Sequence, residues 1–205
     1  RILRAARPGT LALGGRISEP VRKAAQAAGV ELVDYFLRPE LACLNAVPTA
    51  EGCLALLMQL RQRTIWESEF LVLGYGRIGR AVARRLQALG GQGAAARCAG
   101  LHAAPLTALE QLLPHFDAVI NTIPAPVLGA AQLRCLPRGA LILDLASRPG
   151  GTDFAAAREL GLRAEHALSL PARCAPETAG ALVAHTVEVI LQERAATARS
   201  ERGVS

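Results

Sequence analysis

The chain has 205 residues, of which 51% are hydrophobic and 20% are charged, a composition typical of a soluble globular protein. Its net charge is +6, but the arginines are scattered over helical faces and lack interleaved aromatic residues, so we expect no nucleic-acid partner. No apolar run approaches the ~20 residues of a membrane span, and we expect no membrane partner. The five cysteines form no C-x-x-C pair, which predicts reduced thiols in a cytoplasmic protein and no metal site.

The N-terminal stretch has the pattern of a strand, a helix and a second strand. An apolar run over 10–13 is followed by a helical pattern from Ser18 and by another apolar run over 30–33. The chain begins with Arg1 rather than Met within this pattern, so we expect its natural N-terminus to be missing. We assign 1–47 to the end of an N-terminal α/β domain.

A long apolar-periodic helix is expected over 50–63, and we interpret 48–66 as a spine between two domains. Strands and helices then alternate through 67–193, which predicts an α/β fold with a Rossmann-like, doubly wound parallel sheet. The polar end, 194–205, is expected to be a flexible tail. The expected strands are 70–73, 93–96, 118–121, 141–145 and 163–165, and the expected helices are 78–89, 106–113, 130–133, 154–160 and 176–192.

A glycine turn lies between the first strand of this domain and its helix. Gly74 would permit the tight turn, Gly76 the approach of a pyrophosphate, and Gly79 close packing of the helix on the strand. The phosphates would lie on free N–H groups at the positive end of the helix. The strand-turn-helix context favours this interpretation over a turn that binds nothing. The cofactor residues expected here are Gly74, Tyr75, Gly76, Arg77, Ile78 and Gly79.

The second strand of the domain favours NADP(H) over NAD(H). An Asp or Glu about 20 residues after the turn would hold the ribose 2′-hydroxyl of NAD. The tract 91–98 has no carboxylate, and Arg97 stands near its end. An arginine there suits a 2′-phosphate. The alternative is that Arg97 only caps the end of the strand on the surface.

Two further strand ends carry candidate cofactor residues, because ligands of open parallel sheets lie beyond the carboxyl ends of the strands. Each residue taken singly is better explained by the solvation of a loop than by a function. Their shared placement at one sheet edge indicates a site. These candidates are Asn121, Thr122, Ile123, Pro124, Asp144, Leu145 and Ala146.

Five runs of the sequence resemble the dehydrogenase-like A subunits of dipicolinate synthases from endospore-forming bacteria. The resemblance covers about residues 14–191, and the run Ser-Arg-Pro-Gly-Gly-Thr-Asp at 147–153 is its most specific part. The chain departs from the family at Ala172, where a glycine is usual, and in a second strand rich in Gly and Ala. The family also has a longer N-terminal domain. The matching runs are 45–52, 71–79, 120–124, 141–154 and 175–180.

The resemblance implies an oxidation of a dihydro- or hydroxytetrahydro-dipicolinate to pyridine-2,6-dicarboxylate, with hydride passed to NADP⁺. It places this reaction on a branch of the lysine/diaminopimelate pathway, in the cytoplasm of the mother cell during sporulation. It also implies a flavoprotein-like B subunit as partner and leaves a homo-oligomer open. A substrate with two carboxylates needs positive or N–H-rich partners, which makes Arg148, beside Ser147, the first candidate for a clamp. Thr49 and Glu51 would face the cleft from the long helix, and the identity of the general base stays open.

Two other functions are compatible with the sequence. A 2-hydroxy-acid or alanine dehydrogenase would share the two-domain fold, but such enzymes usually place a catalytic His in the cleft. No His is expected at a strand end here, and we interpret His166 and His185 as packing or surface residues. A Rossmann module that senses a nucleotide, or only pairs with a partner subunit, is the third function.

Overall fold

The computed structural model describes residues 2–66, 68–96 and 105–202. The chain forms two compact units, Ala46–Pro176 and a smaller one made of Arg1–Asn45 together with Glu177–Ser205. The boundaries differ from the expected ones, because the last helix groups with the N-terminal unit rather than with the Rossmann domain.

The smaller unit contains a two-stranded parallel sheet in which Leu11 pairs with Glu31. The buried carboxylate of Asp34, at the end of the second strand, accepts hydrogen bonds from the N–H groups of Ile17 and Phe36 at 2.8 and 3.0 Å. Burial raises the pKa of Asp34, but these hydrogen bonds, a third from the N–H of Arg16 and the charge of Arg22 lower it, and the net shift is downward. The elements are α1 (Ile2–Ala5), β1 (Leu11–Gly14), α2 (Glu19–Ala27), β2 (Glu31–Asp34), η1 (Tyr35–Leu37), α3 (Pro39–Leu44) and α10 (Pro176–Arg202).

The last helix, α10, is longer than the sequence suggested. It runs through Arg202, so the segment 194–202, expected to be flexible, is helical. The physical reason is its composition, because Ala, Arg and Glu are good helix formers even where a helix is polar on all sides. Within the smaller unit, Arg38 Nη2 donates to Glu193 Oε1 at 2.5 Å and ties α3 to α10.

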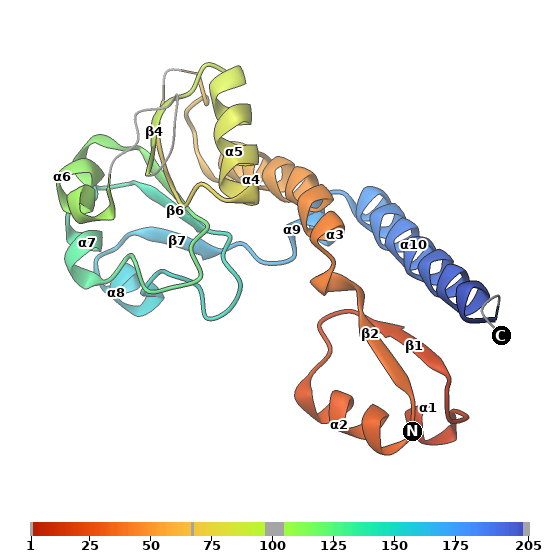
Figure 1. Cartoon of the computed structure of the whole chain (residues 1–205). Coiled ribbons are helices and arrows are strands. Elements are labelled where there is room, and N and C mark those ends of the chain that lie inside the picture. Colours follow the sequence, from red (N-terminus) through yellow and green to blue (C-terminus); the bar gives the residue numbers. More distant parts are fainter. Residues whose placement is uncertain (1, 67, 97–104, 203–205) are drawn as a thin grey trace. The chain divides into compact units, whose positions relative to one another are not determined.

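The larger unit is built on a five-stranded, fully parallel sheet with the order β4-β3-β5-β6-β7 (Figure 1). From β3 the chain first adds β4 on one side and then returns to add β5 on the other. The end of β3 is therefore the topological switch point, where ligands of such sheets bind. The strands are β3 (Glu69–Leu73), β4 (Gln92–Ala96), β5 (Ala118–Asn121), β6 (Leu141–Asp144) and β7 (Arg163–His166).

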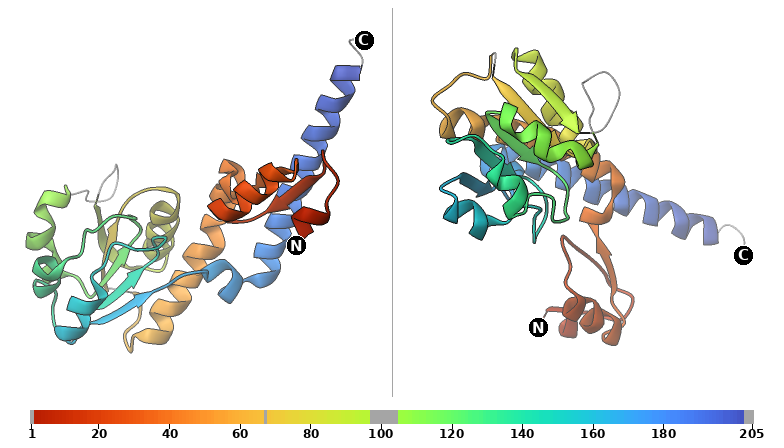
Figure 2. Two further views of the ribbon diagram at one scale, coloured as in Figure 1. Left: turned by 90° about the horizontal axis from the view of Figure 1, so that it is seen from below. Right: turned by 90° about the vertical axis from the view of Figure 1, so that its left-hand side faces the viewer.

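Helices cover both faces of this sheet (Figure 2), because successive strand residues point to opposite sides. Phe70 and Val72 pack with α4 and α5 on one face, whereas Leu71 and Leu73 pack with the shorter helices on the other. The doubly wound α/β fold expected from the sequence is confirmed. The helices are α4 (Ala46–Leu60), α5 (Arg77–Ala88), η2 (Leu106–Ala108), α6 (Leu109–Leu112), η3 (Leu113–His115), α7 (Ala130–Arg134), α8 (Phe154–Glu159) and α9 (Leu170–Cys174).

Among the residues that the structure describes, one stretch of 22 residues, Pro39–Leu60, is long and apolar enough to cross a membrane by length and composition, and its most apolar 18-residue part has a mean hydropathy of 1.5. The expectation that no such run exists was wrong. Half of its most apolar part is buried inside the protein, and α4 contributes Ala50, Cys53 and Leu57 to the core. Burial raises the pKa of the Cys53 thiol to about 12, so this cysteine packs as a neutral apolar side chain. Packing against the sheet accounts for the apolar character of α4.

Candidate functional site

The three glycines of the turn after β3 occupy three different environments. Gly74 has φ +88°, a conformation that side chains rarely adopt. A Cβ on Gly79 would lie 2.1 Å from the carbonyl oxygen of Gly74, so only glycine lets α5 approach the strand this closely. A Cβ on Gly76 would meet no protein atom within 4 Å. Protein packing therefore requires glycine at 74 and 79, while at 76 the protein leaves open space.

The start of α5 fits an anionic ligand. Gly76 is the N-cap and has no side chain to bond the free N–H groups, and the first turn carries no acidic residue. Tyr75 and Ile78 are partly buried and pack against the core, while Arg77 is exposed. Free main-chain donors at the positive end of a helix favour phosphate. These residues match what a dinucleotide requires.

The loop after β5 is attached directly to the glycine turn. Thr122 Oγ1 donates to the carbonyl oxygen of Leu73 at 2.9 Å. A Cβ on Gly74 would lie 2.5 Å from Thr122 Oγ1 and 2.9 Å from Ile123. Thr122 and Ile123 are half-buried and Pro124 is exposed, so these three expected cofactor residues remain within reach of a ligand.

Asn121 and Asp144, by contrast, face the interior at the ends of β5 and β6. Both side chains are 0% exposed. Asn121 Nδ2 donates to Asp144 Oδ1 at 3.0 Å and to the carbonyl oxygen of Ile123 at 3.1 Å. Asn121 Oδ1 accepts from the N–H of Ile123 at 3.0 Å. The structure therefore differs from the expectation that Asn121 lines a cofactor ribose, because its polar atoms are hydrogen-bonded inside the protein.

Asp144 shapes the loop that follows β6. Its Oδ1 accepts from the N–H of Ala146 at 3.0 Å and its Oδ2 from the N–H of Gly151 at 2.8 Å. Leu145 and Ala146 are buried at 7% and 4% exposure, so neither presents its side chain to a ligand here. Asp144 thus acts as a buried acceptor that folds the loop back on itself, which is a structural task rather than a direct contact with a cofactor.

Ser147 and Arg148 are the exposed part of this loop. The loop is closed beneath them by the N–H of Gly150, which donates to the carbonyl oxygen of Ser147 at 2.9 Å. Among the residues that the structure describes, no ion pair involves Arg148. An exposed guanidinium on a tightly folded loop, at the ligand edge of the sheet, is suited to bind a carboxylate.

The two candidates on α4 lie in different surroundings. Thr49 is half-buried in the first turn of the helix. Glu51 is exposed, and its Oε1 lies 3.2 Å from Arg85 Nη2 on α5. Arg85 is eight residues beyond Arg77, the first residue of α5, and thus about 12 Å along the helix at 1.5 Å per residue. The ion pair with Arg85 explains Glu51 as part of the α4–α5 packing, and its expected place in the catalytic cleft stays a prediction.

His166 lies at the end of a strand, where the sequence analysis expected no histidine. The structure extends β7 by one residue beyond the expected end, so His166 is the last residue of the strand and pairs with Asp144 in the sheet. A His does therefore stand at a strand end, contrary to expectation. Its Nε2 lies 2.9 Å from the carbonyl oxygen of Ala146. The alternation of side chains in Arg-Ala-Glu-His, 163–166, was the feature of the sequence that could have indicated a strand ending at His166.

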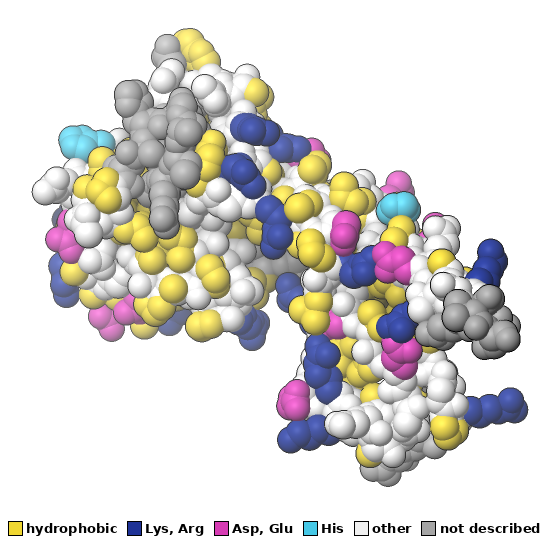
Figure 3. Space-filling view, in the orientation of Figure 1, with side chains coloured by type: hydrophobic (Ala, Val, Ile, Leu, Met, Phe, Trp, Pro, Cys, Tyr) yellow, Lys and Arg dark blue, Asp and Glu magenta, His cyan; other side chains and the backbone are white. Residues whose placement is uncertain are grey.

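Arg97, on which the choice of cofactor depends, lies outside the described residues. Positive charge is nevertheless present near the turn, because Arg77, Arg80 and Arg84 are exposed along α5 at helical spacing. Figure 3 shows Lys and Arg side chains gathered over this helix. Such a row raises the local concentration of anions in general, so it does not discriminate NADP(H) from NAD(H).

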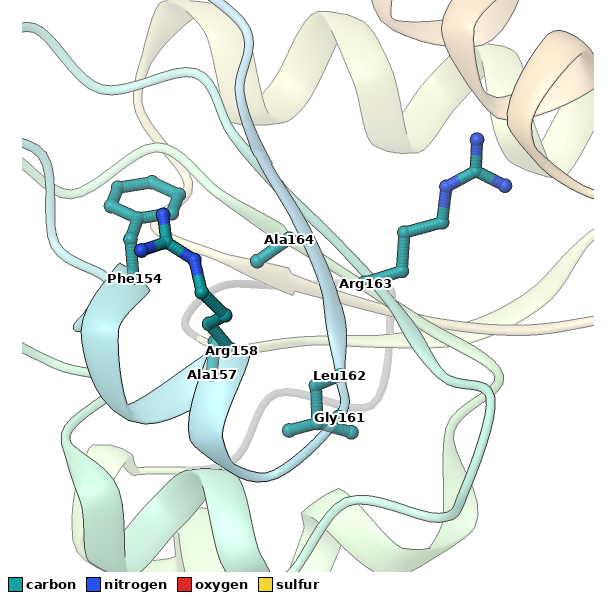
Figure 4. A pocket seen from close by; sticks show the side chains of 7 residues that line it. All are labelled: Phe154, Ala157, Arg158, Gly161, Leu162, Arg163 and Ala164. Atoms are coloured by element: carbon teal, nitrogen blue, oxygen red, sulfur yellow. The ribbon is translucent and has the colours of Figure 1, made fainter.

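A shallow hollow of about 600 Å³ lies between α8 and the edge strand β7 (Figure 4). Two strands separate it from β3 and its glycine turn. The guanidinium of Arg163 points away from Arg158 in this view, and it donates to the carbonyl oxygen of Leu60 at 2.6 Å. The hollow is thus distinct from the candidate site. Its lining residues are Phe154, Ala157, Arg158, Gly161, Leu162, Arg163 and Ala164.

The parallel sheet and the glycine turn after β3 are those of a Rossmann domain of the dehydrogenase type. Residues 51–149 match the family model described as D-isomer specific 2-hydroxyacid dehydrogenase, NAD binding domain. The A subunit of dipicolinate synthase from Bacillus subtilis (strain 168) is 39% identical over 173 residues, which are 80% of this chain and 58% of that protein. The chain belongs to the family of dipicolinate synthase A subunits, which confirms the resemblance inferred from the sequence runs.

Two solved structures support this assignment. The A chain of dipicolinate synthase from Bacillus subtilis is 35% identical with a TM-score of 0.87, over 95% of this chain and 69% of that one. The A subunit from Bacillus halodurans is 34% identical with a TM-score of 0.84, over 88% of this chain and 66% of that one. The chain thus spans between 58% and 69% of the length of these relatives.

The glycine environments predict a clear contrast between two substitutions. Gly76→Ala should lower the free energy of unfolding by no more than about 1 kcal/mol, because the added methyl meets open space and only the preference of the helix N-cap for glycine over alanine is lost. It should weaken NADPH binding at least about tenfold, since the methyl would stand where the diphosphate approaches. Denaturant unfolding and fluorescence titration with NADPH measure the two effects.

Gly79→Ala is the matched comparison, because its methyl would meet the carbonyl oxygen of Gly74. It should destabilise the fold by ~1–3 kcal/mol as an overpacked contact and weaken NADPH binding as well. Unchanged affinity for NADPH in Gly76→Ala would show that no diphosphate lies at this turn.

Proposed function

We propose that the chain is the dehydrogenase-like subunit of a dipicolinate-forming enzyme. A dihydrodipicolinate loses a hydride to NADP⁺ and a proton to a base, which gives pyridine-2,6-dicarboxylate, NADPH and H⁺. A hydroxytetrahydro-dipicolinate would first lose water to give the dihydrodipicolinate, a step that leaves the oxidation state unchanged. The observation that supports this most directly is the exposed Arg148, held at the same sheet edge as the glycine turn by the buried Asp144.

The cofactor assigned to this site is NADP(H), which supplies the hydride acceptor when bound. The main-chain N–H groups from Gly76 to Gly79 would hold its diphosphate, and Thr122 with Ile123 would lie beside them. Arg97 would receive the 2′-phosphate, because the second strand offers no carboxylate for a ribose hydroxyl.

The task of the chain's own residues is to orient the ring and to balance its charge. Aromatisation of the ring makes the hydride easy to remove, so little further activation is required. Arg148 can bind one carboxylate through two parallel N–H donors, and this bidentate geometry would fix the plane of the ring. Ser147, exposed beside it, can donate a further hydrogen bond.

The partners follow from the same proposal. The substrate is a small dicarboxylate, and the second subunit is the flavoprotein-like B subunit, with a homo-oligomer as a further arrangement. The protein would act in the cytoplasm of the mother cell of a sporulating bacterium. The proposed partners include neither a nucleic acid nor a membrane.

A 2-hydroxy-acid dehydrogenase is the second candidate, favoured by the family model that matches 51–149. Such an enzyme needs a His free to exchange a proton with the substrate. Since His166 Nε2 lies 2.9 Å from the carbonyl oxygen of Ala146, this nitrogen is used within the protein. This contact weighs against the second candidate.

The carboxylate clamp predicts a selective defect in Arg148→Ala. Binding of pyridine-2,6-dicarboxylate, measured by calorimetry with NADP⁺ present, should weaken about 10- to 100-fold, since a hydrogen-bonded charge pair is lost. The affinity for NADPH should stay within about threefold, because the clamp does not contact the cofactor. Arg158→Ala, which removes an exposed arginine on α8, should leave both affinities unchanged. Equal dicarboxylate binding by wild type and Arg148→Ala would contradict the clamp.

The cofactor choice predicts a selective defect in Arg97→Ala. NADPH binding should weaken about 10- to 100-fold through the loss of a charge-assisted contact with the 2′-phosphate, while NADH binding should hardly change. Fluorescence titrations with the two nucleotides measure the ratio, with Arg158→Ala again as the control. A similar loss for both nucleotides would remove the assignment of Arg97.

A further inference from the structure

The loop that carries Arg148 is held from below by two neighbouring strand ends. Asp144, the last residue of β6, accepts from the N–H groups of Ala146 and Gly151 at 3.0 and 2.8 Å. His166, the last residue of β7, lies with Nε2 2.9 Å from the carbonyl oxygen of Ala146. Both polar groups of Ala146 are thus held from the sheet, one by each side chain. The next residue, Ser147, begins the exposed part of the loop.

The imidazole of His166 is itself fixed in place. Its ring stacks on Phe154 with centroids 5.3 Å apart and an interplanar angle of 24°. A Cβ on Gly150 would lie 3.2 Å from His166 Nε2 and 3.1 Å from Asp144 Oδ2, so the loop backbone closes over both groups. Because a carbonyl oxygen only accepts, the proton of the ring must be on Nε2. The ring therefore acts as a fixed donor beneath the loop.

We propose that His166 is a positioning residue for substrate binding, which acts by holding Ala146 and thereby the apex of the loop with Arg148. This inference rests on the proposed function, in which Arg148 binds a carboxylate of the substrate. A clamp works only if its guanidinium is placed to within a fraction of an ångström, and such placement comes from supporting hydrogen bonds. Asp144 alone holds the N–H of Ala146, whereas His166 holds its carbonyl oxygen.

The chemistry of the ring separates positioning from acid–base catalysis. The hydrogen bond to Ala146 uses the Nε2 proton, and this proton is present in the neutral Nε2–H ring and in the imidazolium alike. A side chain that keeps a donor at this place should therefore keep the function, even though it cannot titrate. Glutamine places its amide nitrogen near the position of Nε2, while the shorter asparagine reaches only the position of Nδ1.

The test compares His166→Gln, His166→Asn and His166→Leu, with His115→Leu, an exposed histidine of η3, as the control. In His166→Asn and His166→Leu, the dissociation constant of pyridine-2,6-dicarboxylate with NADP⁺ present should rise about tenfold, as for the loss of one hydrogen bond. The affinity for NADPH should stay within about twofold. Hydrogen exchange in a peptide covering 146–151 should become faster by a similar factor. His166→Gln and His115→Leu should match wild type in all three measurements.

Unchanged exchange over 146–151 in His166→Leu would overturn the proposal, and so would a defect in His166→Gln as large as that in His166→Leu. If the leucine variant does not fold, the contrast between the glutamine and asparagine variants decides in its place. Failure of the proposed function is recognised separately, because Arg148→Ala would then bind pyridine-2,6-dicarboxylate normally. In that event the exchange measurement still decides whether His166 holds the loop.

Discussion

The architecture of the site depends on one close contact, in which the Cα of Gly79 packs against the carbonyl group of Gly74. Any side chain at 79 would overlap that oxygen, so glycine alone allows α5 to begin immediately beyond β3. This contact brings the start of the helix to the switch point of the sheet, and the free N–H groups there become the natural place for a phosphate. Gly76 keeps the approach to these groups open.

A second constraint organises the neighbouring loops from inside the protein. Asn121 and Asp144 are buried and hydrogen-bonded to each other across adjacent strand ends. Each also bonds to backbone groups of the loop that follows its own strand. Leaving either group unsatisfied in the interior would cost about 1–3 kcal/mol. The loops are therefore fixed before any ligand arrives, and Arg148 is presented from a loop that is already folded.

Much of the fold could be predicted from the sequence, because apolar runs mark the buried strands clearly and glycines mark the turns that follow them. The strand 118–121 and the start of the helix at Phe154 are found where the patterns placed them. Side-chain roles were harder to predict, since a polar residue at a strand end can face a ligand or the interior, and periodicity does not distinguish them. Asn121 was expected to face the cofactor for that reason. Glu51 was likewise expected to face the cleft. Its ion pair with Arg85 on α5 joins two helices, and sequence spacing cannot reveal such a partner.

The central claim is that a nicotinamide dinucleotide binds where β3 ends and α5 begins. A crystal structure of the protein with NADPH tests it most directly. The account predicts electron density for the diphosphate against the main-chain N–H groups of 76–79. A dinucleotide bound elsewhere, or side chains filling the space above Gly76, would contradict it.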